Sequence, residues 1–158
     1  MVTIQQISDY VIFKSKFEGN SDLSNLKLQK LLYYIQAWHL AFNEGQPLFK
    51  ENFEAWIHGP VNREIYNLYK DTKYLYSEMG LEDMQEPNID AILSNDIKNH
   101  VNNILDSYAK FTATELEIMT HQETPWLEAR SGVPTNERCN NEIKNDTMHR
   151  YYAARLQI

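Results

Sequence analysis

The chain has 158 residues, the size of one ordinary domain, and its 42% of hydrophobic residues can form a core that needs no metal or disulfide. Its formal net charge of -7 on average repels phosphate backbones, which disfavours nucleic acid and suits a basic partner. The single Cys139 cannot form an internal disulfide and no apolar run reaches membrane-spanning length, so we expect a cytoplasmic protein with one domain over residues 1–158.

Two helices are predicted in the first part of the chain. Apolar residues return at helical spacing over residues 3–17, and Gly19 marks the end of this first helix. Capping side chains precede a second apolar face over residues 28–42, which ends before Gly45. This second pattern is the most regular in the chain.

A short strand is predicted next. Residues 53–58 alternate between two faces and stop at Gly59 and Pro60. We expect residues 47–49 to pair with this strand as a small hairpin. A third helix follows, and Asn62 is a candidate for its cap.

The following segment combines glycine, proline and acidic residues over residues 77–93, which predicts a surface loop. A fourth helix is expected over residues 97–108, after possible caps at Ser94 and Asn95. Thr112 and Glu115 have the spacing of a capping box, which predicts the start of a fifth helix.

The last part of the chain completes the predicted fold. Pro125 is expected to terminate the fifth helix, and residues 126–130 form a short turn or helix. A last helix is predicted over residues 140–155. The fold class is therefore mainly α, a compact single-domain bundle of about six helices with a small β-hairpin.

Aromatic, histidine and proline residues gather at three element ends, namely residues 38–39, 56–60 and 121–126. Tryptophan and histidine have an apolar body and a polar tip, so they can anchor a partner at a half-buried interface. Packing in the core is the alternative. For Trp38, which has helical spacing with other apolar residues, core packing is favoured, whereas both interpretations stay open for Trp56 and Trp126.

Motifs for metal binding and catalysis are absent from the sequence. His39, His58 and His121 could converge on a metal, but they lack the spacing of known ligand motifs, so we expect no metal and no cofactor. Cys139 has no evident base among its sequence neighbours. We expect that the protein is not an enzyme. The less favoured alternative is a metal hydrolase that uses His58, His121 and nearby acids.

Three blocks of residues and a closing helix follow one another in a recognisable order. They are Leu26–Tyr34 (LKLQKLLYY) with Ala37–Ala41, then Pro47–Phe49 with Glu54–Val61 and Ile65–Tyr66, then Thr120–Trp126 (THQETPW) with Ala129–Arg130, and finally Asn141–Ile143 with Tyr151–Tyr152. In this order they resemble the Panacea domain of SocA-like antitoxins and phage-associated GepA-like proteins, and the resemblance covers roughly residues 4–152. Asn62 and Arg63 depart from the family, which often continues with a second valine and a proline.

The resemblance implies an antitoxin of a toxin-antitoxin system, which neutralises a cognate toxin by direct protein contact. Such pairs are often encoded side by side in bacteria or their prophages, and SocA delivers its toxin to the ClpXP protease. The alternative is a proteolytic adaptor or a phage regulatory binding protein without a linked toxin. No nucleic acid or membrane is expected as a partner, and the resemblance leaves the oligomeric state open.

Two blocks that end their elements with histidine, proline and tryptophan are the candidates for a partner-binding surface. We expect that these residues form or support one surface; the alternative is that they only fasten the hairpin to the helices. The candidate residues are Trp56, His58, Gly59, Pro60, His121, Pro125, Trp126 and Arg130.

Overall fold

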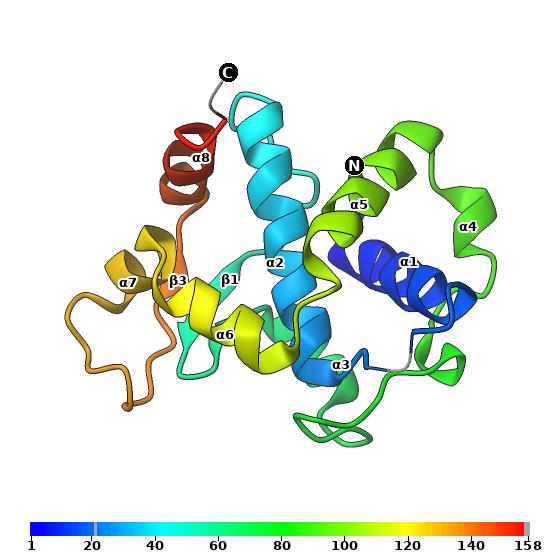
Figure 1. Cartoon of the computed structure of the whole chain (residues 1–158), viewed down its shortest axis with the longest axis horizontal. Coiled ribbons are helices and arrows are strands. Elements are labelled where there is room, and N and C mark those ends of the chain that lie inside the picture. The colour runs from blue at the N-terminus through cyan, green and yellow to red at the C-terminus, as the bar shows by residue number, and fades with distance from the viewer. Residues whose placement is uncertain (21, 157–158) are drawn as a thin grey trace.

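Helices make up most of the chain, and a small sheet is packed among them (Figure 1). The computed structural model describes residues 1–20 and 22–156. Within these residues the helices are α1 (Ile4–Phe17), α2 (Asn25–Phe42), α3 (Arg63–Tyr69), α4 (Ile89–Ile92), α5 (Asn95–Tyr108), α6 (Ala113–His121), α7 (Thr124–Arg130) and α8 (Asn145–Ala153), with a 3-10 turn η1 (Leu81–Asp83). Strands β1 (Phe53–Trp56), β2 (Gly59–Val61) and β3 (Glu142–Ile143) form an antiparallel sheet in the order β2-β1-β3. None of the helices in the described residues is long and apolar enough to cross a membrane.

Helix α2 lies in the middle of the molecule, between α1 and α5 on one side and α8 on the other (Figure 1). Its apolar residues from Leu28 to Ala37 are buried on all sides of the helix, as expected for an element that other helices surround. The buried polar residues of α2 are satisfied by loops. Gln36 donates to the carbonyl of Phe49 and accepts from the amide of Leu48, and Gln29 makes the corresponding pair of bonds with Asn62.

A cluster of tyrosines joins α8 to α2. The hydroxyl groups of Tyr34 and Tyr152 both donate to the carboxylate of Glu123, at 2.9 and 2.7 Å. Burial raises the pKa of Glu123, and hydrogen bonds from Tyr152 and Tyr34 oppose this shift. Trp38 is half-buried and packs edge-on against Tyr152, which agrees with its predicted place at the core.

The predicted helix starts are confirmed where a cap was identified. The side chain of Asn62 accepts from the amide of Ile65 at the start of α3, and Ser94 caps α5 in the same way. Thr112 and Glu115 form a reciprocal capping box at the start of α6. Local hydrogen bonds therefore fix these boundaries.

The predicted hairpin partner was wrong. Residues 47–49 form no strand, because the side chain of Gln36 binds the backbone of Leu48 and Phe49 and leaves these groups satisfied by α2. Strand β1 instead pairs with β2 across the turn at residues 57–58, and with β3 on its other edge.

Three further boundaries differ from the predictions. The last helix begins at Asn145 rather than at residue 140, because Ile143 belongs to β3 and pairs with Phe53. Helix α6 already ends at His121, and Pro125 lies in the first turn of α7, where no amide is required. The predicted loop at 77–93 contains η1 and α4, and the short turn or helix predicted at 126–130 is the helix α7, so the described residues hold eight α-helices instead of about six.

Candidate functional site

The eight candidate residues converge where the β1–β2 hairpin meets α6 and α7. The indole Nε1 of Trp126 donates to the carbonyl of Trp56 at 2.9 Å, which ties the third sequence block to the second. Trp126 is fully buried and Pro125, Gly59 and Pro60 are buried as well. Because these four residues are buried, they cannot form the solvent-exposed surface of the site, and they lie in the packed layer behind it.

Arg130 is buried and holds three carbonyl groups. One guanidinium nitrogen donates to Ala55 of β1 at 2.8 Å, and another donates to Pro134 and Glu137 in the following loop. The guanidinium lies over the ring of Trp126, 4.5 Å from its centroid. Arg130 therefore fastens the loop between α7 and β3 to the hairpin.

His121 packs against the ring of Trp126. The two rings are stacked with centroids 4.0 Å apart. Burial lowers the pKa of His121, and the positive charges of Lys30 and Arg130 lower it further, although Glu117 acts in the opposite direction. A neutral imidazole that stacks on an indole serves packing rather than charge.

The turn at Gly59 encloses a buried lysine of α2. Gly59 has a φ of +100°, and a Cβ at this position would lie 2.6 Å from Cε of Lys30, so only glycine fits. The ammonium group of Lys30 donates to the carbonyl of Pro60 at 2.9 Å. Burial lowers the pKa of Lys30 to about 7, and Glu117 opposes this shift.

The low pKa of Lys30 predicts a pH dependence of stability. Between the folded pKa of about 7 and the ordinary value of 10.5, the unfolded chain binds more protons than the folded one, so the free energy of unfolding rises with pH. We expect a slope of up to about 1.4 kcal/mol per pH unit between about pH 7.5 and 9.5. Urea denaturation across this range measures it.

The control for this slope is Lys30→Met, which keeps the aliphatic chain. The half-buried histidines, whose pKa values are lowered, affect stability only below this window, and the tyrosines with raised pKa values act above it. The variant should therefore lose the slope. An unchanged slope in Lys30→Met would assign it to another group.

Trp56, His58 and His121 are not fully buried, and of these three Trp56 and His58 line grooves at the surface. Trp56 is half-buried, and the side chain of His58 is 46% exposed and lies 3.1 Å from Glu117. Tyr66 packs edge-on against the Trp56 ring, and the guanidinium of Arg63 lies 5.2 Å from its centroid. The indole is therefore held in place by neighbours from α3 while part of it stays in contact with solvent.

Two adjoining grooves meet at these residues. We call the shared lining, Trp56, Ile57, His58 and Tyr66, the Trp56 face. One groove, of about 630 Å³, extends to Arg63 and to residues 138–140, and the other, of about 300 Å³, extends along residues 70–75 and the start of α2. A concave surface with rigid aromatic residues is typical of a protein-binding site.

The sequence patterns missed Arg63, Tyr66, Lys70 and Arg138 as members of this site. Arg63 and Tyr66 belong to α3, Lys70 directly follows it, and Arg138 comes from a distant loop. Arg138 reaches the face because the bonds from Arg130 fold the loop back toward β1. The distance in sequence between this loop and the hairpin hides the contact.

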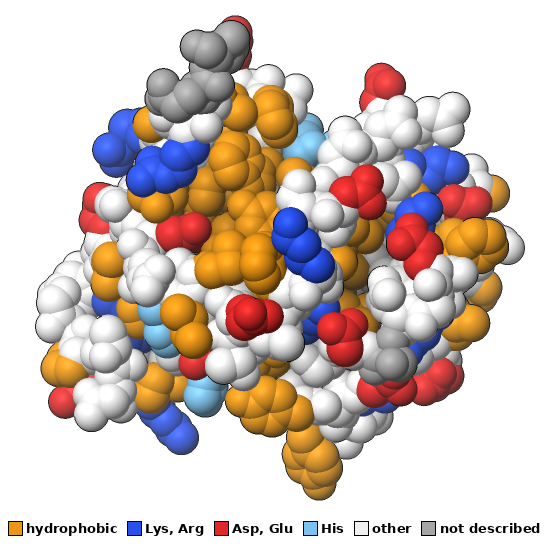
Figure 2. Space-filling model, in the orientation of Figure 1, with side chains coloured by type: hydrophobic (Ala, Val, Ile, Leu, Met, Phe, Trp, Pro, Cys, Tyr) orange, Lys and Arg blue, Asp and Glu red, His pale blue; other side chains and the backbone are white. Residues whose placement is uncertain are grey.

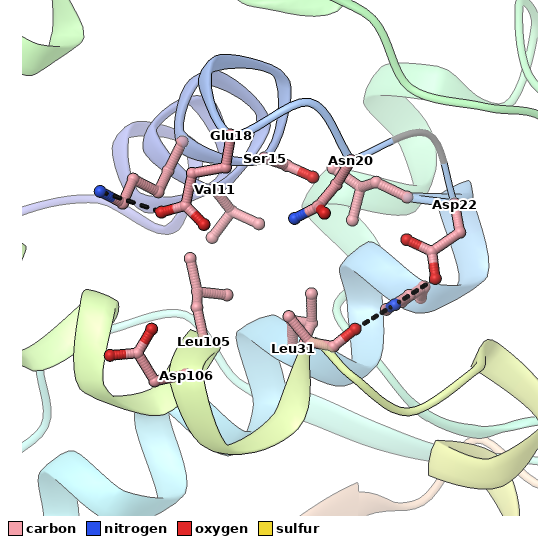
Figure 3. Close-up of a pocket in the computed structure, with 12 residues that line it drawn as sticks. Val11, Ser15, Glu18, Asn20, Asp22, Leu31, Leu105 and Asp106 are labelled. Carbon is pink, nitrogen blue, oxygen red and sulfur yellow. Dashed lines mark hydrogen bonds and ion pairs between the residues drawn. The ribbon is translucent and has the colours of Figure 1, made fainter.

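A small cavity between α1, α2 and α5 is structural (Figure 3). Its volume of about 30 Å³ leaves room for little more than a water molecule. On its border the buried ammonium of Lys27 lies 2.9 Å from Asp22 and donates to the carbonyl of Ala109. These bonds join the start of α2 to the end of α5.

A third groove lies over α2, α5 and α6 and is largely apolar. Figure 2 shows it as a hydrophobic hollow in the middle of one face of the molecule. Trp38, Phe42, Tyr108 and Met119 line it, and its charged lining is one acid and one base, so it shows no preference for the charge of a ligand.

The histidines do not form a metal cluster in the part of the chain that is described. His39 lies against His100, with ring centroids 5.4 Å apart, whereas His58 contacts Glu117 and His121 contacts Trp126. No group of three histidine, cysteine or acidic residues in these ranges could hold an ion. Cys139 and His58 line one groove, but no hydrogen bond joins them within the described residues.

Comparison with known proteins identifies the class and then the family. The sequence profile of an antitoxin-like domain, described as "Antitoxin SocA-like, Panacea domain", matches residues 28–127. The match spans more than half of the chain, from α2 through the hairpin to the start of α7. The chain therefore belongs to the SocA-like Panacea-domain family. No curated protein and no solved structure matches the chain.

Proposed function

We propose that this protein is the antitoxin of a toxin-antitoxin system and neutralises its cognate toxin by direct binding through the Trp56 face. Membership of the antitoxin-like family supports the role. The choice of surface rests on how Trp56 is held. Trp126 and Arg130 bind the backbone of Trp56 and Ala55 and so fix the strand, and Tyr66 and Arg63 pack on the half-buried indole. A preorganised aromatic anchor loses little entropy on binding.

The candidate residues then have two roles. Trp56 and His58 contact the toxin, whereas Gly59, Pro60, His121, Pro125, Trp126 and Arg130 position them. This division follows from the burial of the second group, in which only His121 is half-buried. The protein acts by binding and is not an enzyme, and delivery of the bound toxin to the ClpXP protease is one way in which binding could end in neutralisation.

The rival functions make different predictions. A proteolytic adaptor or phage regulator without a linked toxin has a harmless neighbouring gene. A hydrolase based on His58 and His121 loses activity with chelators or histidine substitution while it stays folded. Hydrogen bonding of His58 to Glu117 and stacking of His121 on Trp126 give both rings a packing role.

The decisive experiment expresses the adjacent small open reading frame in a bacterial host, with and without this protein. We expect the neighbour to stop growth, and this protein to restore growth and to co-purify with it. The double variant Trp56→Ala/His58→Ala should lose rescue, because truncating a central aromatic anchor costs about 2 kcal/mol or more of binding, roughly 30-fold in affinity.

The matched control is Tyr76→Ala, which removes an aromatic ring that is 64% exposed and lines neither groove. It should rescue growth like the unchanged protein. Circular dichroism and thermal melting must first show that each variant is folded. A folded Trp56→Ala/His58→Ala variant that neutralises fully would reject this surface, and a harmless neighbour or rescue without binding would reject direct neutralisation.

A further inference from the structure

The two grooves at the Trp56 face have a local charge opposite to that of the whole protein. Their lining contains four cationic side chains, Arg63, Lys70, Lys73 and Arg138, and no aspartate or glutamate. The chain as a whole has a net charge of -7. Because salt screens surface charges beyond about 8 Å, a bound segment responds mainly to the charges of the groove itself.

Two of these cations are engaged in ion pairs and two are not. Arg63 lies 2.8 Å from Glu54, and Lys73 lies 3.0 Å from Asp83. Lys70 and Arg138 are exposed and make no ion pair within residues 1–20 and 22–156. Each groove is therefore lined by one cation that makes no ion pair with any of the described residues.

Aromatic rings lie between and beside these cations. Tyr66 is 39% exposed and packs on Trp56, and Tyr74 is 87% exposed at the far side of the smaller groove. Such rings bury apolar side chains of a partner, while the flanking cations pair with its carboxylates. The combination fits a segment that has both acidic and apolar residues.

We propose that the Trp56 face binds an acidic segment of the partner protein, an inference that rests on the proposed function. Its carboxylates pair with Lys70 and Arg138, and an apolar side chain between them packs on Trp56 and Tyr66. The overall negative charge of the chain suggests a basic partner. At the binding site, however, the cations that line the grooves favour an acidic segment.

A short acidic peptide fits these observations better than a nucleic acid. Single strands also use cations and stacking rings, but they gain affinity by neutralising many phosphates along a track. Among the described residues, each groove has one cation without an ion pair, which is too few for such a track. The net negative charge of the protein also repels a longer polyanion.

The test is a fluorescence anisotropy titration at low ionic strength with three labelled probes. They are the peptide Glu-Glu-Leu-Trp-Glu-Glu, its analogue with glutamine in place of each glutamate, and an oligothymidylate. We expect the acidic peptide to bind, the glutamine analogue to bind at least tenfold more weakly, and added salt to weaken the acidic peptide. Equal binding of the two peptides, or tighter binding of the oligothymidylate, would overturn the proposal.

Charge-reversal variants locate the binding site. Lys70→Glu/Arg138→Glu should weaken the acidic peptide at least tenfold. The control Lys50→Glu/Lys144→Glu makes the same change in net charge at two exposed lysines that line neither groove, and it should bind nearly as well as the unchanged protein. Equal weakening in both double variants would show that net charge, and not this face, attracts the peptide.

The same variants separate this inference from the proposed function. If Lys70→Glu/Arg138→Glu still co-purifies with the adjacent gene product and restores growth, the acidic-segment inference is wrong while the antitoxin role stands. If the neighbour is harmless, the antitoxin role is wrong, and the peptide titration still decides what the grooves bind.

Discussion

Replacing Trp126 with alanine is expected to lower the free energy of unfolding by about 3–5 kcal/mol, the usual cost of removing a large aromatic side chain from a core. The side chain is fully buried between the stacked ring of His121 and the guanidinium of Arg130. The carbonyl of Trp56 also loses the hydrogen bond from the indole. Urea denaturation followed by circular dichroism measures the change.

The control for this variant is Tyr74→Ala, because Tyr74 is 87% exposed and its loss should change stability by no more than about 0.5 kcal/mol. A Trp126→Ala variant as stable as the Tyr74→Ala variant would contradict the packing described here. Because Trp126 is fully buried, its substitution tests packing and not partner contact, and the binding experiments therefore rely on Trp56 and His58.

Replacing Arg130 with alanine should cost about 3 kcal/mol or more, because hydrogen bonds from a charged donor contribute about 1.5–3 kcal/mol each. The guanidinium donates to the carbonyls of Ala55, Pro134 and Glu137, while its own Nε has no hydrogen-bond partner among residues 1–20 and 22–156. Urea denaturation measures the loss. Limited proteolysis should also show faster cleavage within residues 131–141, which Arg130 no longer fastens to β1.

Two comparisons isolate the cause. Arg130→Met keeps much of the side-chain volume, so it should lose most of the same stability if hydrogen bonds dominate and little if packing dominates. Arg150→Ala removes an arginine whose side chain is 61% exposed and whose only ion pair among the described residues is with Asp146, so it should change stability by at most about 0.5 kcal/mol. Unchanged proteolysis in Arg130→Ala would reject its role in placing the loop.

The sequence predicted those parts of the fold that depend on neighbours in the chain. Helix α2 follows from the spacing of its apolar residues, and the starts of α3 and α6 follow from the caps at Asn62 and Thr112. The strand that pairs with β1 could not be predicted. It depended on whether the amide of Leu48 and the carbonyl of Phe49 would form hydrogen bonds with β1 or with the side chain of Gln36. That competition is settled between elements far apart in the chain.

Residues of the candidate site divide in the same way. The tryptophans, histidines and prolines at the ends of elements were recognised from residue type and from the family resemblance, and their positions along the chain place them in two separate blocks. The tertiary structure was needed to show that Trp56 stays partly exposed while Trp126 is buried, and that Lys70 and Arg138 line the two grooves that meet at the Trp56 face. The burial of a side chain and the charges around it depend on contacts between several elements, such as the bond from Arg130 to Ala55. Helix periodicity and capping, in contrast, are properties of a few consecutive residues.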